Sequence, residues 1–373
     1  MNPTKVPPSS STGPFCIGLD LHSDNVVVAV RQTVPCQSEL KGELIHLRRF
    51  SVNGEAAKLH LGEALEPYCQ NPGTRAVVES TYNWYWLADL FESKGWDLRV
   101  CDPSTVSRAN IKVADDFTDA NYLAEMLRIG SIKTTPIMPK AQRAVRDFTR
   151  ARQALVRERA KAKITIINLF TNHLSERIKI NRLVAEAYTA IEEDRPVDGD
   201  LVASYFDNEL VRERVGSQLR LILFYDQEIA KADEKIAAAV KTDDRMRRLR
   251  TIKGCGQVLS AAIAVELGDF SRFPSRKCFV SYCRLAPTAK LSNGKSKGTG
   301  NAKNGNAYLS WALTELANLV IRFNPSAKRF YDKIFNRTHL RVKAIRAVAA
   351  KLARAIFMML KHGQDFEAAR CFG

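Results

Sequence analysis

The chain of 373 residues is too long for one ordinary domain, and its 45% of hydrophobic residues can build two or three cores, which excludes a disordered chain. Lys and Arg together number 57 against 40 Asp and Glu, so the formal net charge is +17. An excess of this size favours a polyanionic partner, with nucleic acid ahead of a membrane surface.

The cysteines and the N-terminus indicate a cellular compartment. Eight cysteines occur without a Cys-x-x-Cys pair or the Cys and His spacing of a zinc site, so we expect reduced thiols in a cytosolic protein. Met1 to Pro14 is rich in Pro and Ser and has no apolar core, which predicts a loose tail rather than a signal peptide. No apolar run reaches the roughly 18 residues of a membrane span, so we expect a soluble, cytoplasmic protein that does not contact a membrane.

The segment from Phe15 to about residue 138 has the pattern of a mixed α/β domain. Three strand-like runs follow one another as a meander, and helix-like and strand-like runs then alternate. The expected strands are 16–22, 25–32, 43–52, 74–80 and 97–102, and the expected helices are 55–68, 84–94 and 116–127. Three strands followed by a β/α alternation is the order of elements in a ribonuclease H-like, or RuvC-like, domain.

The middle of the chain predicts long helices with a strong positive charge. Residues 139–163 hold nine basic residues against two acidic ones, all in good helix formers. Candidate nucleic-acid contacts on this helix are Lys140, Arg143, Arg146, Arg150 and Arg157. A second helical run at about 201–240 has the apolar spacing of an antiparallel partner, and either a plain helical bundle or a dimerising coiled coil fits the pattern.

The C-terminal third predicts an all-α region interrupted by a polar loop. Gly254 and Gly256 open an Ala-rich helix that ends at Gly268, a pattern typical of a helix-hairpin-helix, in which glycines let backbone amides approach a phosphate; a plain helix turn is the alternative. Residues 291–306 are dominated by Gly, Ser, Asn and Lys and predict a mobile loop. Lys295, Lys297 and Lys303 of that loop are further candidate phosphate contacts. Helices are expected at 307–322 and 340–361.

Four carboxylates are placed to bind metal ions. Asp20 lies within the first strand, Glu79 ends the run AVVES, and Asp116 and Asp119 share one face of the helix that begins near residue 116. Mg²⁺ prefers hard oxygen ligands, and a two-ion site about 4 Å across can cleave a phosphodiester. An ion pair, a helix cap and helix first-turn charges are the structural alternatives. His22, two residues after Asp20, is interpreted as a polar surface residue and not as a metal ligand.

Several motifs together resemble one family of DNA-rearranging enzymes. The runs GLDLH, VVEST, DDFTDA, IKGCG, ELGDFSRF, LAPTAKLSNGK and KNGNAYL resemble, in that order, the DEDD-type transposases of the IS110 insertion-sequence family, whose relatives include Piv-type DNA invertases. The resemblance implies a RuvC-like domain, a coiled coil and a C-terminal transposase domain with a catalytic serine. The expected divisions are a flexible tail at 1–14, the DEDD domain at 15–138, the basic helix and coiled coil at 139–246, and the transposase domain at 247–373.

The resemblance also implies the roles of single residues. Asp20, Glu79, Asp116 and Asp119 would hold two Mg²⁺ ions. Ser292, which follows the Leu285-x-Pro287 turn, would be the nucleophile, with Ser296 as the alternative register. The implied enzyme cuts and rejoins DNA strands at the ends of its element and at the target. It acts as a dimer or tetramer, takes a structured guide RNA in at least some members, and works at the bacterial nucleoid.

Two other functions fit the same residues. A metal-dependent, Holliday-junction-resolving nuclease would need the carboxylates but not the serine. A DNA-binding protein without enzymatic activity would need neither, and it would show only a salt-dependent affinity for DNA.

Overall fold

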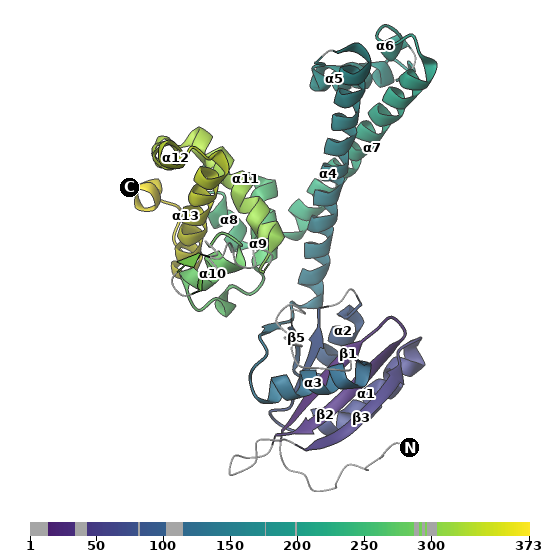
Figure 1. The fold of residues 1–373 in the computed structure, drawn as a ribbon, viewed down its shortest axis with the longest axis vertical. Coiled ribbons are helices and arrows are strands. Elements are labelled where there is room, and N and C mark those ends of the chain that lie inside the picture. Colours follow the sequence, from purple (N-terminus) through teal and green to yellow (C-terminus); the bar gives the residue numbers. More distant parts are fainter. Residues whose placement is uncertain are drawn as a thin grey trace. The chain divides into compact units, whose positions relative to one another are not determined.

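The chain folds into two units, residues 1–140 and residues 141–373 (Figure 1). A computed structural model describes residues 14–33, 43–80, 83–101, 115–175, 177–197, 200–286, 291–292, 295–296 and 304–373. Each unit has its own hydrophobic core.

The first unit is built on a six-stranded mixed sheet in the order β3-β2-β1-β4-β5-β6. Strands β1, β4 and β5 are parallel, whereas β2 runs antiparallel to β1 and β3 antiparallel to β2. The strands are β1 Phe15–Leu21, β2 Asn25–Gln32, β3 Leu44–Ser51, β4 Arg75–Glu79, β5 Leu98–Cys101 and β6 Thr134–Pro136. This order is consistent with a RuvC-like domain. The first five strands confirm the sequence prediction, and the three-residue β6, antiparallel to β5, was not predicted.

Helices cover both faces of this sheet. Helices α1 (Glu55–Cys69) and α2 (Tyr85–Lys94) contribute Leu61, Leu65 and Phe91 to the core on one face. Helix α3 (Asp116–Arg128) packs on the other face through small residues and leucines. All three helices confirm the sequence prediction. They could be predicted because each has an apolar stripe at helical spacing.

Gly18 sets how closely helix α3 approaches strand β1. A Cβ atom at Gly18 would lie 2.1 Å from the carbonyl oxygen of Ala120 and 2.5 Å from the amide nitrogen of Ala124, both backbone atoms of α3. Only a residue without a side chain permits this approach, and Ala120 and Ala124 keep the helix surface flat opposite it. The first turn of α3 therefore lies close to the end of β1.

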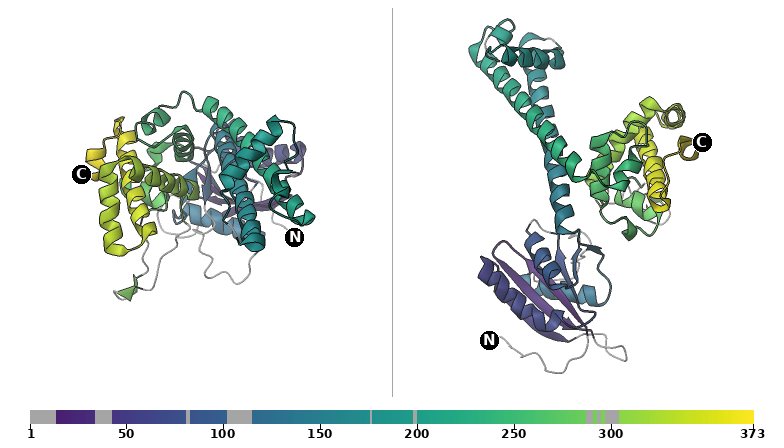
Figure 2. Two further views of the ribbon diagram at one scale, coloured as in Figure 1. Left: turned by 90° about the horizontal axis from the view of Figure 1, so that it is seen from above. Right: turned by 180° about the vertical axis from the view of Figure 1, so that it is seen from behind.

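The second unit begins with a long antiparallel helix pair, α4 (Lys140–Leu174) and α7 (Glu209–Ala239), seen side by side in both views of Figure 2. Ion pairs from Arg152 to Asp233 and from Arg159 to Asp226 fix its register. Helices α5 (Ile180–Glu192) and α6 (Asp200–Ala203) pack at the far end of the pair. The antiparallel partner was predicted. Helix α5 was not, α4 continues past the predicted 163, and residues 204–208 interrupt the run predicted from 201.

The rest of the second unit is a helical cluster around one core. Its elements are α8 Asp244–Leu249, α9 Gln257–Leu267, the 3₁₀ helix η2 Phe270–Arg272, α10 Arg276–Tyr282, β7 Leu291–Ser292, β8 Lys295–Ser296, α11 Ala307–Phe323, α12 Pro325–Thr338, α13 Arg341–His362 and α14 Ala368–Phe372. Helices α9, α11 and α13 confirm the prediction, whereas α10, α12 and α14 were not predicted. The loop expected at 291–306 contains a β7–β8 ladder, and its last residue, Asn306, is buried. None of the helices described has the length and apolar character needed to cross a membrane.

Replacing Gly18 by alanine tests the packing of α3 on β1. Because the new methyl group would meet backbone atoms, Gly18→Ala should lower the free energy of unfolding of the first unit by about 3 kcal/mol, measured by urea denaturation. Gly62→Ala in α1 is the matched control: its methyl group would lie 3.6 Å from the nearest atom, and the change should be under about 1 kcal/mol. Equal effects of the two substitutions would contradict the packing argument.

Candidate metal centre

Strand register places Asp20 on the α3 face of the sheet, in line with residues of three other strands. Asp20 of β1 pairs with Val27 of β2, and Val27 pairs with Arg49 of β3. On the other side, Leu19 pairs with Val78 of β4, so Glu79 follows at the level of Asp20. Side chains at one level of adjacent strands point to the same face. Asp20, Glu79 and Arg49 are thus directed to the face that α3 covers.

The start of helix α3 supplies the second carboxylate. Asp115 is the N-cap, and its side chain accepts a hydrogen bond of 2.6 Å from the backbone amide of Thr118. This bond fixes the first turn and leaves Asp116, the next residue, directed toward β1. The cap gives Asp115 a structural role.

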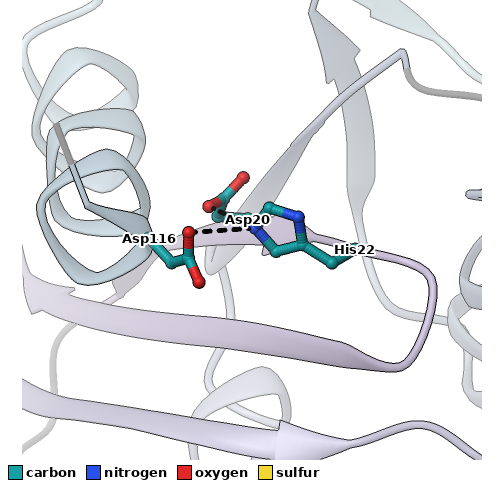
Figure 3. Close-up of side chains that lie close together, drawn as sticks. All are labelled: Asp20, His22 and Asp116. Carbon is teal, nitrogen blue, oxygen red and sulfur yellow. Dashed lines mark hydrogen bonds and ion pairs between the residues drawn. The ribbon is translucent and has the colours of Figure 1, made fainter.

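Asp20, Asp116 and His22 point toward one another at the end of β1 (Figure 3). Nε2 of His22 lies 3.1 Å from Oδ2 of Asp20 and 3.2 Å from Oδ1 of Asp116. One ligand atom from each of the three residues lies within 4.8 Å of the others. Two carboxylates and an imidazole at this spacing suit a divalent cation such as Mg²⁺ or Mn²⁺.

The electrostatics of the cluster favour a cation. Burial raises the pKa of the Asp20 carboxyl above its usual range, His22 acts in the opposite direction, and the charges of Asp119 and Asp116 raise it further. A carboxylate that is half desolvated and close to two other acids gains stability when a cation neutralises it. The donor set and its charge therefore fit a metal ion.

Arg49 already supplies one positive charge. Its Nη2 lies 2.6 Å from Oδ2 of Asp116, and its guanidinium carbon lies 5.2 Å from the ring centroid of Phe117. The Arg49 side chain is 47% exposed, so water and salt screen this ion pair. Arg49 and a metal ion would compete for the same carboxylate.

The other two predicted carboxylates stand at the edge of this cluster. Asp119 lies one turn after Asp116 on α3, near enough to affect the pKa of Asp20. Glu79 ends β4 beside Asp20. Neither belongs to the three-residue group that the described residues form.

Two residues of the site were not among the predicted ligands. His22 was interpreted as a surface residue, although its spacing of two from Asp20 was a signal for a shared face. Arg49 carried no local signal, because only the β2–β3 register brings it to Asp116, 67 residues later.

The predicted serine segment lies in the second unit. Ser292 of β7 pairs with Lys295 of β8, and Leu291 pairs with Ser296. Lys295 is exposed, whereas Lys297 and Lys303 lie outside the described residues. Gly256 is the N-cap of α9 with open space beside it, and Gly254, at φ +101°, packs on α11.

The predicted basic residues of α4 mostly face other parts of the protein. Arg143, a predicted nucleic-acid contact, is only 2% exposed and so is poorly placed to reach a phosphate. Arg150 pairs with Glu266, Arg146 lies 3.7 Å from Asp147, and Lys140 pairs with Asp89 at 3.0 Å. Arg157 is exposed, 5.9 Å from the ring centroid of Tyr308. Of the five, Lys140 and Arg157 remain best placed for a phosphate.

Comparison with known proteins gives matches in both units. Residues 17–174 match a family model described as a transposase, and residues 246–332 match the model of the transposase IS116/IS110/IS902 family. The transposase for insertion sequence element IS1328 of Yersinia enterocolitica is 25% identical over 94% of this chain and 98% of its own length. A probable family 20 transposase of Pseudomonas aeruginosa is 26% identical over 74% of this chain and 80% of its own.

Substituting Arg49 tests its competition with a metal ion. Arg49→Gln should tighten Mn²⁺ binding about two- to fivefold, because it removes a screened positive charge from Asp116. Asp116→Asn should weaken binding about tenfold or more, because a charged ligand is lost. Binding is measured by electron paramagnetic resonance of free Mn²⁺. Arg48→Gln, on the opposite face of β3, is the control and should change nothing; weaker binding in Arg49→Gln would show that Arg49 supports the site instead.

Proposed function

The chain belongs to the IS116/IS110/IS902 family of transposases, and on that premise we propose that it cuts and rejoins the DNA strands of a mobile element with a metal-binding carboxylate site and a serine nucleophile. The observation that carries the proposal is the meeting of Asp20 and Asp116, from two separate segments of the chain, in a group of three potential ligands. DNA is the substrate that the family and the net charge of +17 both favour.

The metal-binding residues in this proposal are Asp20, Glu79, Asp116 and Asp119. Divalent ions held there, two Mg²⁺ by preference, would neutralise charge on the scissile phosphate and on the leaving oxygen. Asp20 and Asp116 are the direct ligands that the geometry favours. Glu79 and Asp119 extend the negative charge on the same face of the sheet, and His22 is the third potential ligand.

Ser292 is the proposed nucleophile. Its Oγ forms a bond to phosphorus, the bond from phosphorus to one ester oxygen breaks, and that oxygen takes up the proton that the serine hydroxyl gives up. The covalent phosphoserine conserves the energy of the phosphodiester, so a second strand end can displace the serine and rejoin the DNA. Lys295, paired with Ser292 across the β7–β8 ladder, is a cation for the developing phosphate charge.

The remaining partners belong to the same proposal. A structured guide RNA would select the DNA sites, and a dimer or tetramer would hold two DNA molecules together. The proposed reaction requires Ser292 and the carboxylates to act on the same phosphate. They belong to different units of the chain, and one protomer or two could supply them.

A metal-dependent, junction-resolving nuclease is the second candidate. It is favoured because the three potential ligands, Asp20, His22 and Asp116, all lie in the first unit, so hydrolysis there would need no residue from the second. Such an enzyme would cleave DNA without forming a covalent intermediate.

A strand-cleavage assay on DNA that carries the element ends, with Mg²⁺, separates the two candidates. Wild type should form a covalent protein–DNA adduct, visible after denaturation. Ser292→Ala should abolish the adduct, and Asp20→Asn should lower its rate by at least about 100-fold. Ser296→Ala, in the same ladder, is the matched control and should retain the adduct.

Each other outcome of this assay has a definite meaning. Loss of the adduct in Ser296→Ala but not in Ser292→Ala would move the nucleophile to Ser296. Cleavage that needs Asp20 and neither serine would establish the nuclease.

A further inference from the structure

The two ends of the segment that carries Ser292 are fastened together at its base. The amide of Asn306 donates a hydrogen bond of 2.6 Å to the carbonyl oxygen of Tyr282, and Nε of Arg284 donates one of 2.9 Å to the carbonyl oxygen of Gly305. A guanidinium nitrogen of Arg346 in α13 donates to the carbonyl oxygen of Arg284. We call residues 282–284 and 305–306 the neck of the serine segment.

Gly305 is what lets the neck close. It adopts φ +98°, and a Cβ atom there would lie 2.4 Å from the carbonyl oxygen of Tyr282. The chain therefore enters and leaves the serine segment at one place, with the β7–β8 ladder between.

Asn306 connects the neck to the interior of the unit. Its Oδ1 caps helix α11 by accepting hydrogen bonds from the amides of Tyr308 and Leu309, at 2.9 and 3.0 Å. Its Nδ2 donates a 2.7 Å hydrogen bond to Oε2 of Glu266, whose side chain is 3% exposed. A buried carboxylate is costly unless it is paired, so this bond belongs to a network that the fold must satisfy.

Arg150 of helix α4 completes the network. Its Nε and Nη2 donate to the two carboxylate oxygens of Glu266 at 2.6 and 2.8 Å, a bidentate pair. The Arg150 guanidinium carbon also lies 4.4 Å from the ring centroid of Tyr308, in the first turn of α11. Helix α4 and the neck thus contact the same buried carboxylate.

We propose that Glu266 is a positioning residue that holds the neck of the serine segment. Through its ion pair with Glu266, Arg150 makes the orientation of the neck depend on the position of helix α4. The inference rests on the proposed role of Ser292. Glu266 is buried, with a side chain only 3% exposed, so its effect on the reaction is indirect. It acts by limiting the orientations that the neck can adopt, and through them where the nucleophile lies, and misplacement of a reacting group by about 1 Å costs on the order of 100-fold in rate.

Asn306→Ser is the most selective test. Serine can still cap α11, but it cannot reach Glu266 as a donor, so the link is cut and the cap remains. Asn324→Ser is the matched control, because Asn324 caps α12 through the same two kinds of bond and contacts no part of the neck. Thermal unfolding monitors the stability of both variants.

The expected result is a rate effect without an affinity effect. At saturating DNA, Asn306→Ser should form the covalent adduct on the order of 100-fold more slowly than wild type, with an unchanged dissociation constant for DNA. Glu266→Gln should behave in the same way, and Asn324→Ser should keep the wild-type rate. Arg150→Gln combined with Asn306→Ser should be no slower than the slower single variant, since both act through Glu266.

A second measurement does not depend on the DNA chemistry. Trypsin should cut after Lys295 faster in Asn306→Ser than in Asn324→Ser, because the neck is looser. A wild-type adduct rate and an unchanged tryptic rate in Asn306→Ser would overturn the positioning role while the function of Ser292 stands. Equal slowing by Asn324→Ser would overturn it as well, because the effect would then be one of stability. An adduct that persists in Ser292→Ala would instead refute the proposed function, and the tryptic rate would still decide whether Glu266 holds the neck.

Discussion

The close packing of helix α3 on strand β1 at Gly18 is the constraint on which the carboxylate site depends. Asp20 is fixed by the sheet, and Asp116 is fixed by the first turn of a helix that comes 96 positions later (116 − 20). The two carboxylates approach each other only because a residue without a side chain lets the helix backbone lie directly on the strand. Arg49 then balances part of the charge that this packing has concentrated, and His22 lies within reach of both carboxylates. The fold thus holds like charges together, and a cation lowers the cost of doing so.

The second unit contains a buried carboxylate whose charge is balanced within the protein. In the first unit the acids face a partly exposed cluster, whereas Glu266 is buried and satisfied by Arg150 and Asn306. Removing one member of such a network leaves another buried and without its partner, which is costly. Buried networks of this kind therefore favour one arrangement of the chain, although they add little net stability. The position of α4 beside α9 and α11 is specified in this manner, as is the register of α4 against α7 through Arg152 and Arg159.

The sequence predicted most of the first unit because its signals are local. Apolar runs indicated β1 and β2, and the position of Asp20 among apolar neighbours indicated a candidate metal-binding carboxylate. Arg49 and β6 had no such signal, since the first depends on cross-strand register and the second has three residues. Arg150 was interpreted as a nucleic-acid contact because its partner, Glu266, lies 116 positions away in the sequence. Helices α5 and α12 were missed for a different reason. Helix α5 is followed by Asp194 and Pro196, which are typical of turns. Helix α12 begins with a proline, which fits the first turn of a helix as well as a loop.

Because the neck is closed, the serine segment can be replaced without changing the rest of the second unit. Residues 282–284 and 305–306 are hydrogen-bonded to one another whatever lies between them, so helices α10 and α11 are not held apart or together by the length of the segment. Doubling the length of a loop whose ends are already joined costs only about 0.6 kcal/mol of chain entropy. The stretch between Leu285 and Gly305 can therefore be lengthened, shortened or replaced while the helical cluster stays intact. Chimaeras that exchange this stretch should therefore fold without redesign of the helical core.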